Sequence, residues 1–161
     1  MGMNSLLLIH GAESVMSDRA LADALLSRAD FERTTVVGSE LEEGRFNEII
    51  APSLFAEKRV VVIKDLQDVT AEVADEISNR IEDRDSSLHL IFIHRGGVKG
   101  KGLLDKIKKL KAEVIACEPM KKASEKEEFV RGEFARLGRK ISSNAVSALV
   151  DATGSDTREL A

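Results

Sequence analysis

The sequence is poor in several residues on which whole classes of protein depend. Its 161 residues include one cysteine, two prolines and neither tryptophan nor tyrosine. A single cysteine, Cys117, excludes an internal disulfide and a multi-cysteine zinc site, and it fits a reducing compartment such as the cytosol. Without tryptophan or tyrosine, we expect no aromatic platform on which nucleic-acid bases could stack.

Excess positive charge and long apolar runs are also missing. The net charge of −4 gives no global field that would attract nucleic acid or an anionic membrane. The first apolar run, Leu6–Ile9, is too short for a signal peptide or a membrane span, and no basic residue precedes it. We therefore expect a cytoplasmic protein without membrane contact. The length indicates one domain, or one domain and the start of another.

The apolar pattern up to about residue 118 alternates between short β-branched or leucine-rich runs and helical spacing. Such alternation predicts an α/β domain in which helices cover both faces of a parallel sheet. Ser14 or Ser17 is expected to cap the first helix. A loop is expected over residues 96–102, which contain four glycines. The five predicted strands span residues 6–10, 34–37, 60–64, 88–94 and 114–117.

After Pro119 the pattern is helical only. One helix is expected to carry Phe129, Phe134 and Leu137, and a second is expected to end near Gly154. A third is capped by Asp156 and stops within its first turns. The pattern therefore predicts an α/β domain over residues 1–118 and an incomplete helical domain over residues 119–161.

The turn after the first strand is where a P-loop enzyme would hold phosphates. Here it reads His10-Gly11-Ala12-Glu13-Ser14-Val15, without the GxxxxGK[ST] motif. The third strand ends in Lys64-Asp65-Leu66 rather than an acidic pair that could hold magnesium and water. We expect no ATP hydrolysis and no cofactor. A degenerate P-loop ATPase is the alternative, with the glycine-lysine loop of residues 96–102 as a nucleotide cradle; a mobile surface loop is favoured there.

Lysines concentrate in and after this loop. They allow contact with DNA phosphates, which would make the chain a DNA-binding adaptor, with Lys99, Lys101, Lys106 and Lys109 as the candidate contacts. A solvated helix face opposite Leu103, Leu104, Ile107 and Leu110 is favoured instead. The concentration consists of Lys99, Lys101, Lys106, Lys108, Lys109 and Lys111, with Lys121 and Lys122 beyond it.

His10 and His94 both end predicted strands, so they could lie close together at the carboxyl edge of the sheet. No third ligand is evident, and we therefore expect no metal site. Cys117 is most simply a small buried apolar residue.

The least ordinary stretch is Leu54-Phe55. The pair follows Pro52 and Ser53, precedes Glu57-Lys58-Arg59, and lies before the β-branched run of residues 60–63. Adjacent side chains on a regular helix or strand point in different directions, so packing both in one core is awkward. On a turn both can project as a wedge into a partner. Core packing and a binding tip remain the two interpretations of the pair.

Several segments, taken in order, resemble the delta subunit of the bacterial DNA polymerase III clamp loader. The first is Leu7-Leu8-Ile9-His10-Gly11-Ala12-Glu13, and the most specific is Ser53-Leu54-Phe55-Ala56-Glu57-Lys58-Arg59-Val60-Val61-Val62. Gly138-Arg139-Lys140-Ile141 and Gly154-Ser155-Asp156-Thr157-Arg158-Glu159-Leu160 follow in the helical part. The resemblance covers nearly the whole chain.

The resemblance implies an AAA+ fold, related to P-loop NTPases, with a defunct nucleotide site and the start of a small helical lid. It implies a non-catalytic subunit that binds the beta sliding clamp and helps to open the ring during replication. Leu54 and Phe55, on a projecting helix, would enter a hydrophobic pocket of the clamp. Ser53, Glu57, Lys58 and Arg59 would surround them. Other subunits would hydrolyse ATP and contact this protein through a C-terminal oligomerisation domain absent from this chain, so that its link to DNA is indirect. Arg158 resembles the AAA+ lid arginine, although packing or a surface ion pair is favoured.

Overall fold

The computed structural model describes residues 3–153 and 156–161. The chain divides into two compact units, Met1–Cys117 and Glu118–Ala161. The helix end predicted near Gly154 and the Gly154-Ser155 part of the last motif lie outside the described residues.

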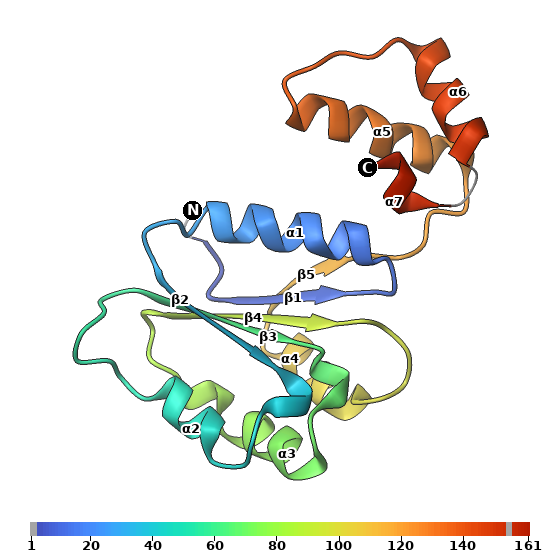
Figure 1. Ribbon diagram of the computed structural model, residues 1–161. Coiled ribbons are helices and arrows are strands. Elements are labelled where there is room, and N and C mark those ends of the chain that lie inside the picture. Colours follow the sequence, from blue (N-terminus) through green and yellow to red (C-terminus); the bar gives the residue numbers. More distant parts are fainter. Residues whose placement is uncertain (1–2, 154–155) are drawn as a thin grey trace. The chain divides into compact units, whose positions relative to one another are not determined.

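The first unit is built on a sheet of five parallel strands in the order β2-β3-β4-β1-β5 (Figure 1), which confirms the predicted α/β class. β2 begins two residues earlier than predicted. β5 ends one residue before Cys117, whose N–H donates to the His10 carbonyl over 2.8 Å. The strands are β1 (Leu6–His10), β2 (Glu32–Val37), β3 (Arg59–Lys64), β4 (Leu88–His94) and β5 (Glu113–Ala116).

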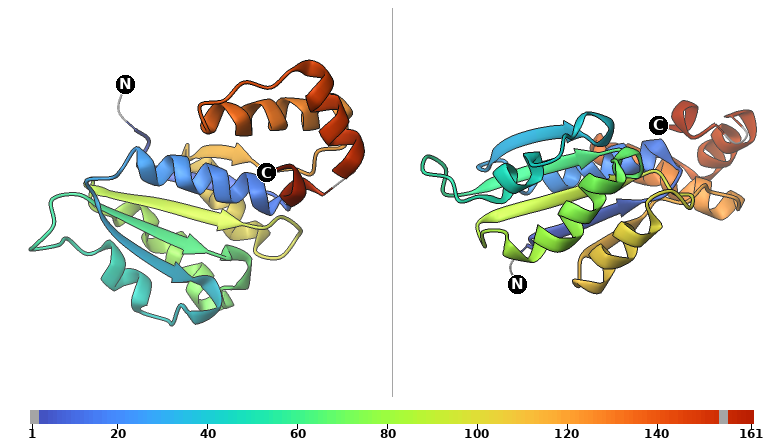
Figure 2. Two further views of the ribbon diagram at one scale, coloured as in Figure 1. Left: turned by 45° about the horizontal axis from the view of Figure 1, so that its top comes forward. Right: turned by 90° about the horizontal axis from the view of Figure 1, so that it is seen from below.

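Helices cover both faces of the sheet, as predicted. Figures 1 and 2 show α1 on one face and α2, α3 and α4 on the other. Their bounds are α1 (Ser14–Leu26), α2 (Arg45–Ile50), α3 (Ala71–Arg80) and α4 (Lys101–Lys109), with short 3₁₀ turns at Gly38–Glu40, Leu66–Asp68 and Ile81–Asp83.

The strands are continuously apolar because each of them is buried on two faces. In β3, Val61 and Ile63 join the core under α2–α4, whereas Val60 and Val62 join the core under α1. Successive side chains of a strand point to opposite faces, so the run of four β-branched residues supplies both cores at once. All four are buried, which makes β3 a rigid support for the segment that precedes it.

Two local predictions in this unit were wrong. The side chain of Glu13, rather than Ser14 or Ser17, accepts the Val15 N–H at the start of α1, and Ser17 is buried within the helix. The loop predicted to reach residue 102 ends at Gly100, because α4 begins at Lys101. A helix start that lacks a capping side chain leaves little signal in the sequence.

The second unit contains α5 (Ala123–Arg136), α6 (Ser143–Thr153) and α7 (Thr157–Leu160). Its small core consists of Val130, Val146, Val150 and Leu160, with Phe129, Phe134 and Ile141 packed against it. Asp156 caps α7 as predicted, accepting the Arg158 N–H over 2.9 Å. Leu137 follows α5 and is exposed. No helix in the part of the chain that the structure describes is long and apolar enough to cross a membrane.

Candidate functional site

The carboxyl edge of the sheet is where a nucleotide would be expected, because β1 leads there into α1. In this turn the Gly11 N–H donates to the His94 carbonyl over 3.0 Å, and the Glu13 N–H donates to the Cys117 carbonyl over 2.9 Å. A β-carbon on Gly11 would lie 2.1 Å from that Cys117 oxygen. The turn is thus packed against the end of β5, and these two amides cannot also hold phosphate oxygens.

His10 and His94 meet at this edge, as their strand-end positions predicted, with ring centroids 5.2 Å apart. His94 is fully buried, and its Nδ1 accepts the Gly96 N–H over 3.0 Å. Its Nε2 must then carry the proton and donate to the Lys99 carbonyl, 2.7 Å away. His94 therefore shapes the loop before α4. Among the described residues no group of three potential ligands could hold a metal ion.

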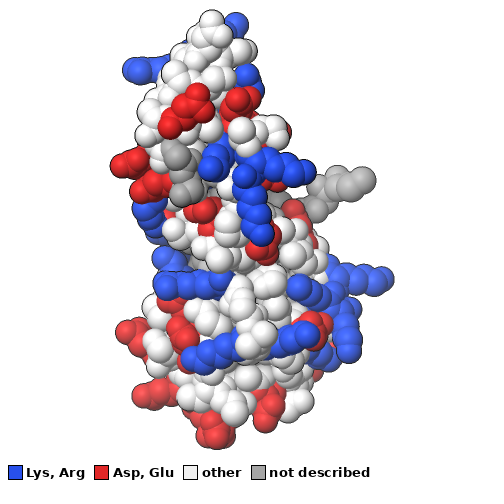
Figure 3. Space-filling view, turned by 90° about the vertical axis from the view of Figure 1, so that its right-hand side faces the viewer, with Lys and Arg blue, Asp and Glu red and all other residues white. Residues whose placement is uncertain are grey.

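The lysines predicted as possible DNA contacts differ in their surroundings. Lys99 pairs with Asp68 over 3.0 Å, and Lys106 pairs with Glu82 over 3.1 Å. The hydrogen bond from Lys99 lowers the pKa of Asp68. Lys101 and Lys109 are exposed. Figure 3, which faces the right-hand side of Figure 1, shows Lys and Arg side chains interspersed with Asp and Glu rather than a uniformly basic face.

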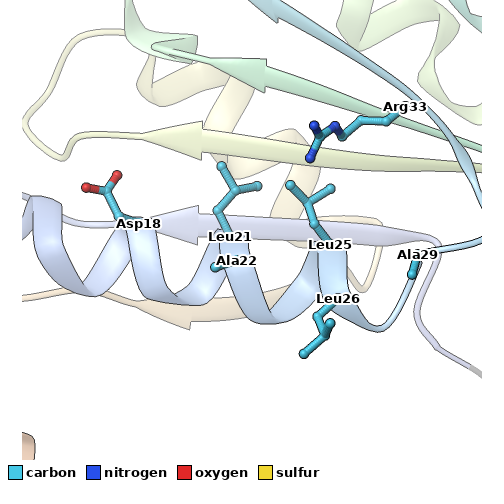
Figure 4. Close-up of a pocket in the computed structure, with 7 residues that line it drawn as sticks. All are labelled: Asp18, Leu21, Ala22, Leu25, Leu26, Ala29 and Arg33. Atoms are coloured by element: carbon cyan, nitrogen blue, oxygen red, sulfur yellow. The ribbon is translucent and has the colours of Figure 1, made fainter. Parts of the chain in front are cut away.

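An apolar groove lies elsewhere, along α1 beside β2. Figure 4 shows Leu21 and Leu25 pointing from α1 toward the side where Arg33 lies, and Leu26 pointing away. The groove contains no pair of groups suited to acid–base or nucleophilic chemistry. Its lining consists of Asp18, Leu21, Ala22, Leu25, Leu26, Ala29 and Arg33.

The opposite, amino edge of the sheet carries the Leu54-Phe55 pair. The pair lies on the segment between α2 and β3, residues 51–58, called the 51–58 loop here; it projects from the left of the α/β unit in Figure 1. Leu54 is 92% exposed and Phe55 is 96% exposed, more than any other large apolar side chain that the structure describes. The core interpretation of this pair is therefore wrong. The projecting helix is also wrong, because residues 51–58 contain no helix.

Local hydrogen bonds give this loop a turn. Ser53 Oγ accepts the Phe55 N–H over 3.2 Å and the Ala56 N–H over 3.1 Å. Pro52 follows the end of α2 and keeps Ala51 extended, with ψ 144°. The turn satisfies backbone groups without covering the two apolar side chains, so both project outward.

The charged residues after the pair have different roles. Glu57 is exposed. Lys58 pairs with Asp30 over 3.1 Å, which lowers the pKa of that carboxyl, and its Nζ lies 5.5 Å from the centre of the Phe31 ring. Arg59, predicted as a rim contact, is half-buried, and its guanidinium donates to two backbone carbonyls of its own chain. Glu57 and Lys58 are therefore exposed in the same loop as the pair, whereas Arg59 is bonded to the end of α2.

Sequence reasoning missed the polar cluster beneath the loop. Buried Arg28 donates to Nδ1 of His89 over 2.9 Å, and the His89 ring lies edge-on to Phe31 at 4.8 Å between centroids. Burial and then the Arg28, Arg84 and Lys58 charges lower the pKa of His89. His89 is 61 residues from Arg28 in the sequence, so no local pattern signals the cluster. A shallow hollow beside it is lined by Asp30, Glu32, Ala56, Glu57 and Lys58.

Comparisons with known proteins concern the fold and the family of the chain. The solved structure of the DNA clamp loader delta protein of Bacillus subtilis matches with a TM-score of 0.70 at 14% identity, covering 98% of this chain and 51% of that one. Two structures of the RuvB protein of Thermotoga maritima match less well. One is the P216G mutant (TM-score 0.61, 14% identity, 96% of this chain and 52% of that one), and the other is described as a Holliday junction branch migration motor (0.58, 15%, 96% and 51%).

At these identities the matches establish the fold alone, which this chain shares with the clamp loader delta protein and RuvB. The family model for "DNA polymerase III, delta subunit" matches residues 16–118. The chain therefore belongs to the DNA polymerase III delta subunit family, as the motifs indicated. It spans about half the length of the solved chains that it matches. No curated protein sequence matches it significantly.

Proposed function

We propose that this chain is a non-catalytic clamp-loader subunit that binds the beta sliding clamp through Leu54 and Phe55. The observation that carries the proposal is the almost complete exposure of two adjacent large apolar side chains on a loop anchored to a rigid strand. Solvent-exposed apolar groups of this size mark contact sites. The family, a component of a DNA polymerase holoenzyme, supplies the kind of partner.

Physically, the pair would act as an anchor. Burial of each side chain in a clamp pocket is worth about 1.5–3 kcal/mol before the costs of association. Ser53 supports the turn, and Glu57 and Lys58 lie at the rim. A ring opens on binding only to the extent that its partner binds the open form better than the closed form. The pair supplies affinity, and neighbouring surface of the α/β unit supplies the preference for the open ring.

The proposal assigns no hydrolysis to this chain. The β1–α1 turn lacks the phosphate-binding lysine, and its Gly11 and Glu13 amides already bond to protein carbonyls. Other loader subunits would supply ATP hydrolysis and meet this protein through a C-terminal domain. Residues 119–161 would begin the lid. In this proposal the protein works in the cytoplasm and approaches DNA indirectly, because Lys99 and Lys106 are already paired with carboxylates.

The test measures the affinity of the purified chain for purified sliding clamp. The double variant Leu54→Ala/Phe55→Ala should weaken binding by roughly 100-fold or more, as expected for two central anchors. The matched control is Val98→Ala, because this apolar side chain is also exposed but lies in the loop after β4, at the opposite edge of the sheet. The control should bind like wild type. Unchanged binding by the double variant would overturn the proposal.

A further inference from the structure

Arg59 occupies the point where the 51–58 loop meets the sheet. It is the first residue of β3, where its N–H donates to the Ser87 carbonyl over 3.3 Å. Its guanidinium reaches back to the other end of the loop, donating from Nη1 to the Ile49 carbonyl over 3.1 Å and from Nη2 to the Ala51 carbonyl over 2.7 Å. One side chain therefore joins both ends of the loop that carries Leu54 and Phe55.

The carbonyls that Arg59 binds need a partner. The last carbonyls of a helix accept no hydrogen bond from within the helix. This applies to most of α2, which is only six residues long and ends before Pro52. A cation near the end of a helix satisfies these groups and interacts favourably with their dipoles. Arg59 comes from the neighbouring strand, so the same bonds also attach α2 to the sheet.

Arg59 holds this position at a cost. Its Nε is buried and has no hydrogen-bond partner among the described residues. Buried donors are nearly always satisfied, so an exception indicates that the rest of the side chain is held firmly by its other contacts. The two carbonyl bonds and the packing against the end of α2 supply that constraint.

We infer that Arg59 is a positioning residue for clamp binding, which holds the loop so that Leu54 and Phe55 project before the partner arrives. The inference rests on the proposed function. Without the Arg59 bonds the loop would sample other shapes, and only the fraction with both side chains projecting would bind. Preorganisation of this kind raises affinity without a direct contact to the partner.

The neighbouring cation, Lys58, does not share this role. Its ion pair with Asp30 is exposed on both sides, and such pairs restrain a chain weakly. Lysine at position 59 could not reproduce the bridge, because one ammonium does not present the planar fork of donors that spans two carbonyls. Arg59→Lys keeps the positive charge and should retain part of the effect. Arg59→Gln removes the charge as well as the bridge and should lose the effect.

The experiment compares Arg59→Gln and Arg59→Lys with wild type in clamp affinity, association rate and thermal stability. Arg59→Gln should weaken binding roughly 10-fold, mainly through slower association, and Arg59→Lys should weaken it less. Hydrogen exchange at the Phe55 and Ala56 amides should become faster in both. Arg80→Gln, which breaks an exposed ion pair with Asp83 in another element, is the matched control and should bind like wild type.

The readout that separates positioning from general support is a double-variant cycle with Leu54→Ala. If Arg59 acts through the pair, Arg59→Gln should matter several-fold less once Leu54 is removed. An equal loss in both backgrounds, or wild-type affinity of Arg59→Gln, would overturn the inference. Failure of the proposed function is seen separately, because Leu54→Ala/Phe55→Ala leaves Arg59 intact and would then bind normally.

Discussion

The two edges of the sheet are built in opposite ways. At the carboxyl edge, where parallel α/β sheets usually bind ligands, the Gly11 and Glu13 amides bond to carbonyls of β4 and of the residue after β5. At the amino edge, a loop held by internal bonds leaves Leu54 and Phe55 almost fully exposed. At the edge that the fold normally uses for nucleotides, these two amides are occupied by protein carbonyls, whereas the edge that is normally a plain connection presents the binding candidate.

The contrast illustrates why a candidate site is argued from particular side chains and not from the fold alone. RuvB has the same fold as this chain. The family assignment comes instead from residues 16–118. Within that region the physical chemistry of particular side chains separates the two edges. Four predictions test how far the separation holds.

The largest effect is expected from two identical substitutions at opposite degrees of burial. Phe92 in β4 is fully buried, whereas Phe55 is 96% exposed. Phe92→Ala should lower the free energy of unfolding by about 3–5 kcal/mol, because it removes apolar burial and leaves a cavity. Phe55→Ala should leave stability unchanged and weaken clamp binding. Chemical denaturation of both variants measures the difference, and substantial destabilisation by Phe55→Ala would mean that the loop packs on the core.

The closed turn at the carboxyl edge should be nearly as sensitive. Gly11 has a φ of +146°, and a β-carbon there would overlap the Cys117 carbonyl. Gly11→Ala should therefore destabilise the chain by roughly 2–3 kcal/mol. Gly44→Ala is the control, since Gly44 also has positive φ, at +87°, but no atom within 4 Å of the added carbon. Equal losses in thermal denaturation would show that the turn is not tightly packed.

A smaller effect is expected at the amino edge as pH falls. Burial and nearby cations lower the pKa of His89 from its ordinary value of 6.5. The unfolded chain then takes up the proton first, so stability is full above pH 6.5 and declines as pH falls through the folded pKa. The decline should be small, because the ring is only half-buried and solvent screens the nearby charges.

His89→Gln provides the comparison for this pH effect, since an amide oxygen can still accept from Arg28 but does not titrate. The difference in unfolding free energy between the two proteins should change between pH 7 and 5. The carboxyls whose pKa is lowered, Asp30, Asp68, Asp85 and Glu125, are present in both proteins, so their contribution cancels in this difference. A constant difference across the window would exclude His89 as its source.

The smallest expected effect is the response to nucleotide. A ligand present at 100 times its Kd would stabilise the folded chain by about 2.7 kcal/mol. Millimolar ATP with magnesium should leave the melting temperature unchanged, because the β1–α1 turn offers neither a phosphate lysine nor the free Gly11 and Glu13 amides. A clear rise in the melting temperature would show that nucleotide binds, and would favour the hypothesis of a degenerate P-loop ATPase.

Prediction from sequence succeeded where a residue's environment follows from its neighbours in the chain. The β-branched run of residues 60–63 indicated a strand buried on both faces, and the meeting of His10 with His94 followed from parallel strands that end at one edge. Prediction failed where the partner is distant. The Arg28–His89–Phe31 cluster and the reach of Arg59 to Ile49 depend on contacts between separate elements.

The sequence alone determined that an α/β sheet forms, that a working phosphate loop is missing, and that Leu54-Phe55 is awkward in a core. These conclusions depend on residue type and local spacing, which the chain carries directly. Only the tertiary structure decided that the pair projects from a loop rather than a helix, and that Arg59 turns back to the end of α2. Exposure and side-chain direction depend on which surfaces the other elements have already covered, and that is a property of the packed molecule.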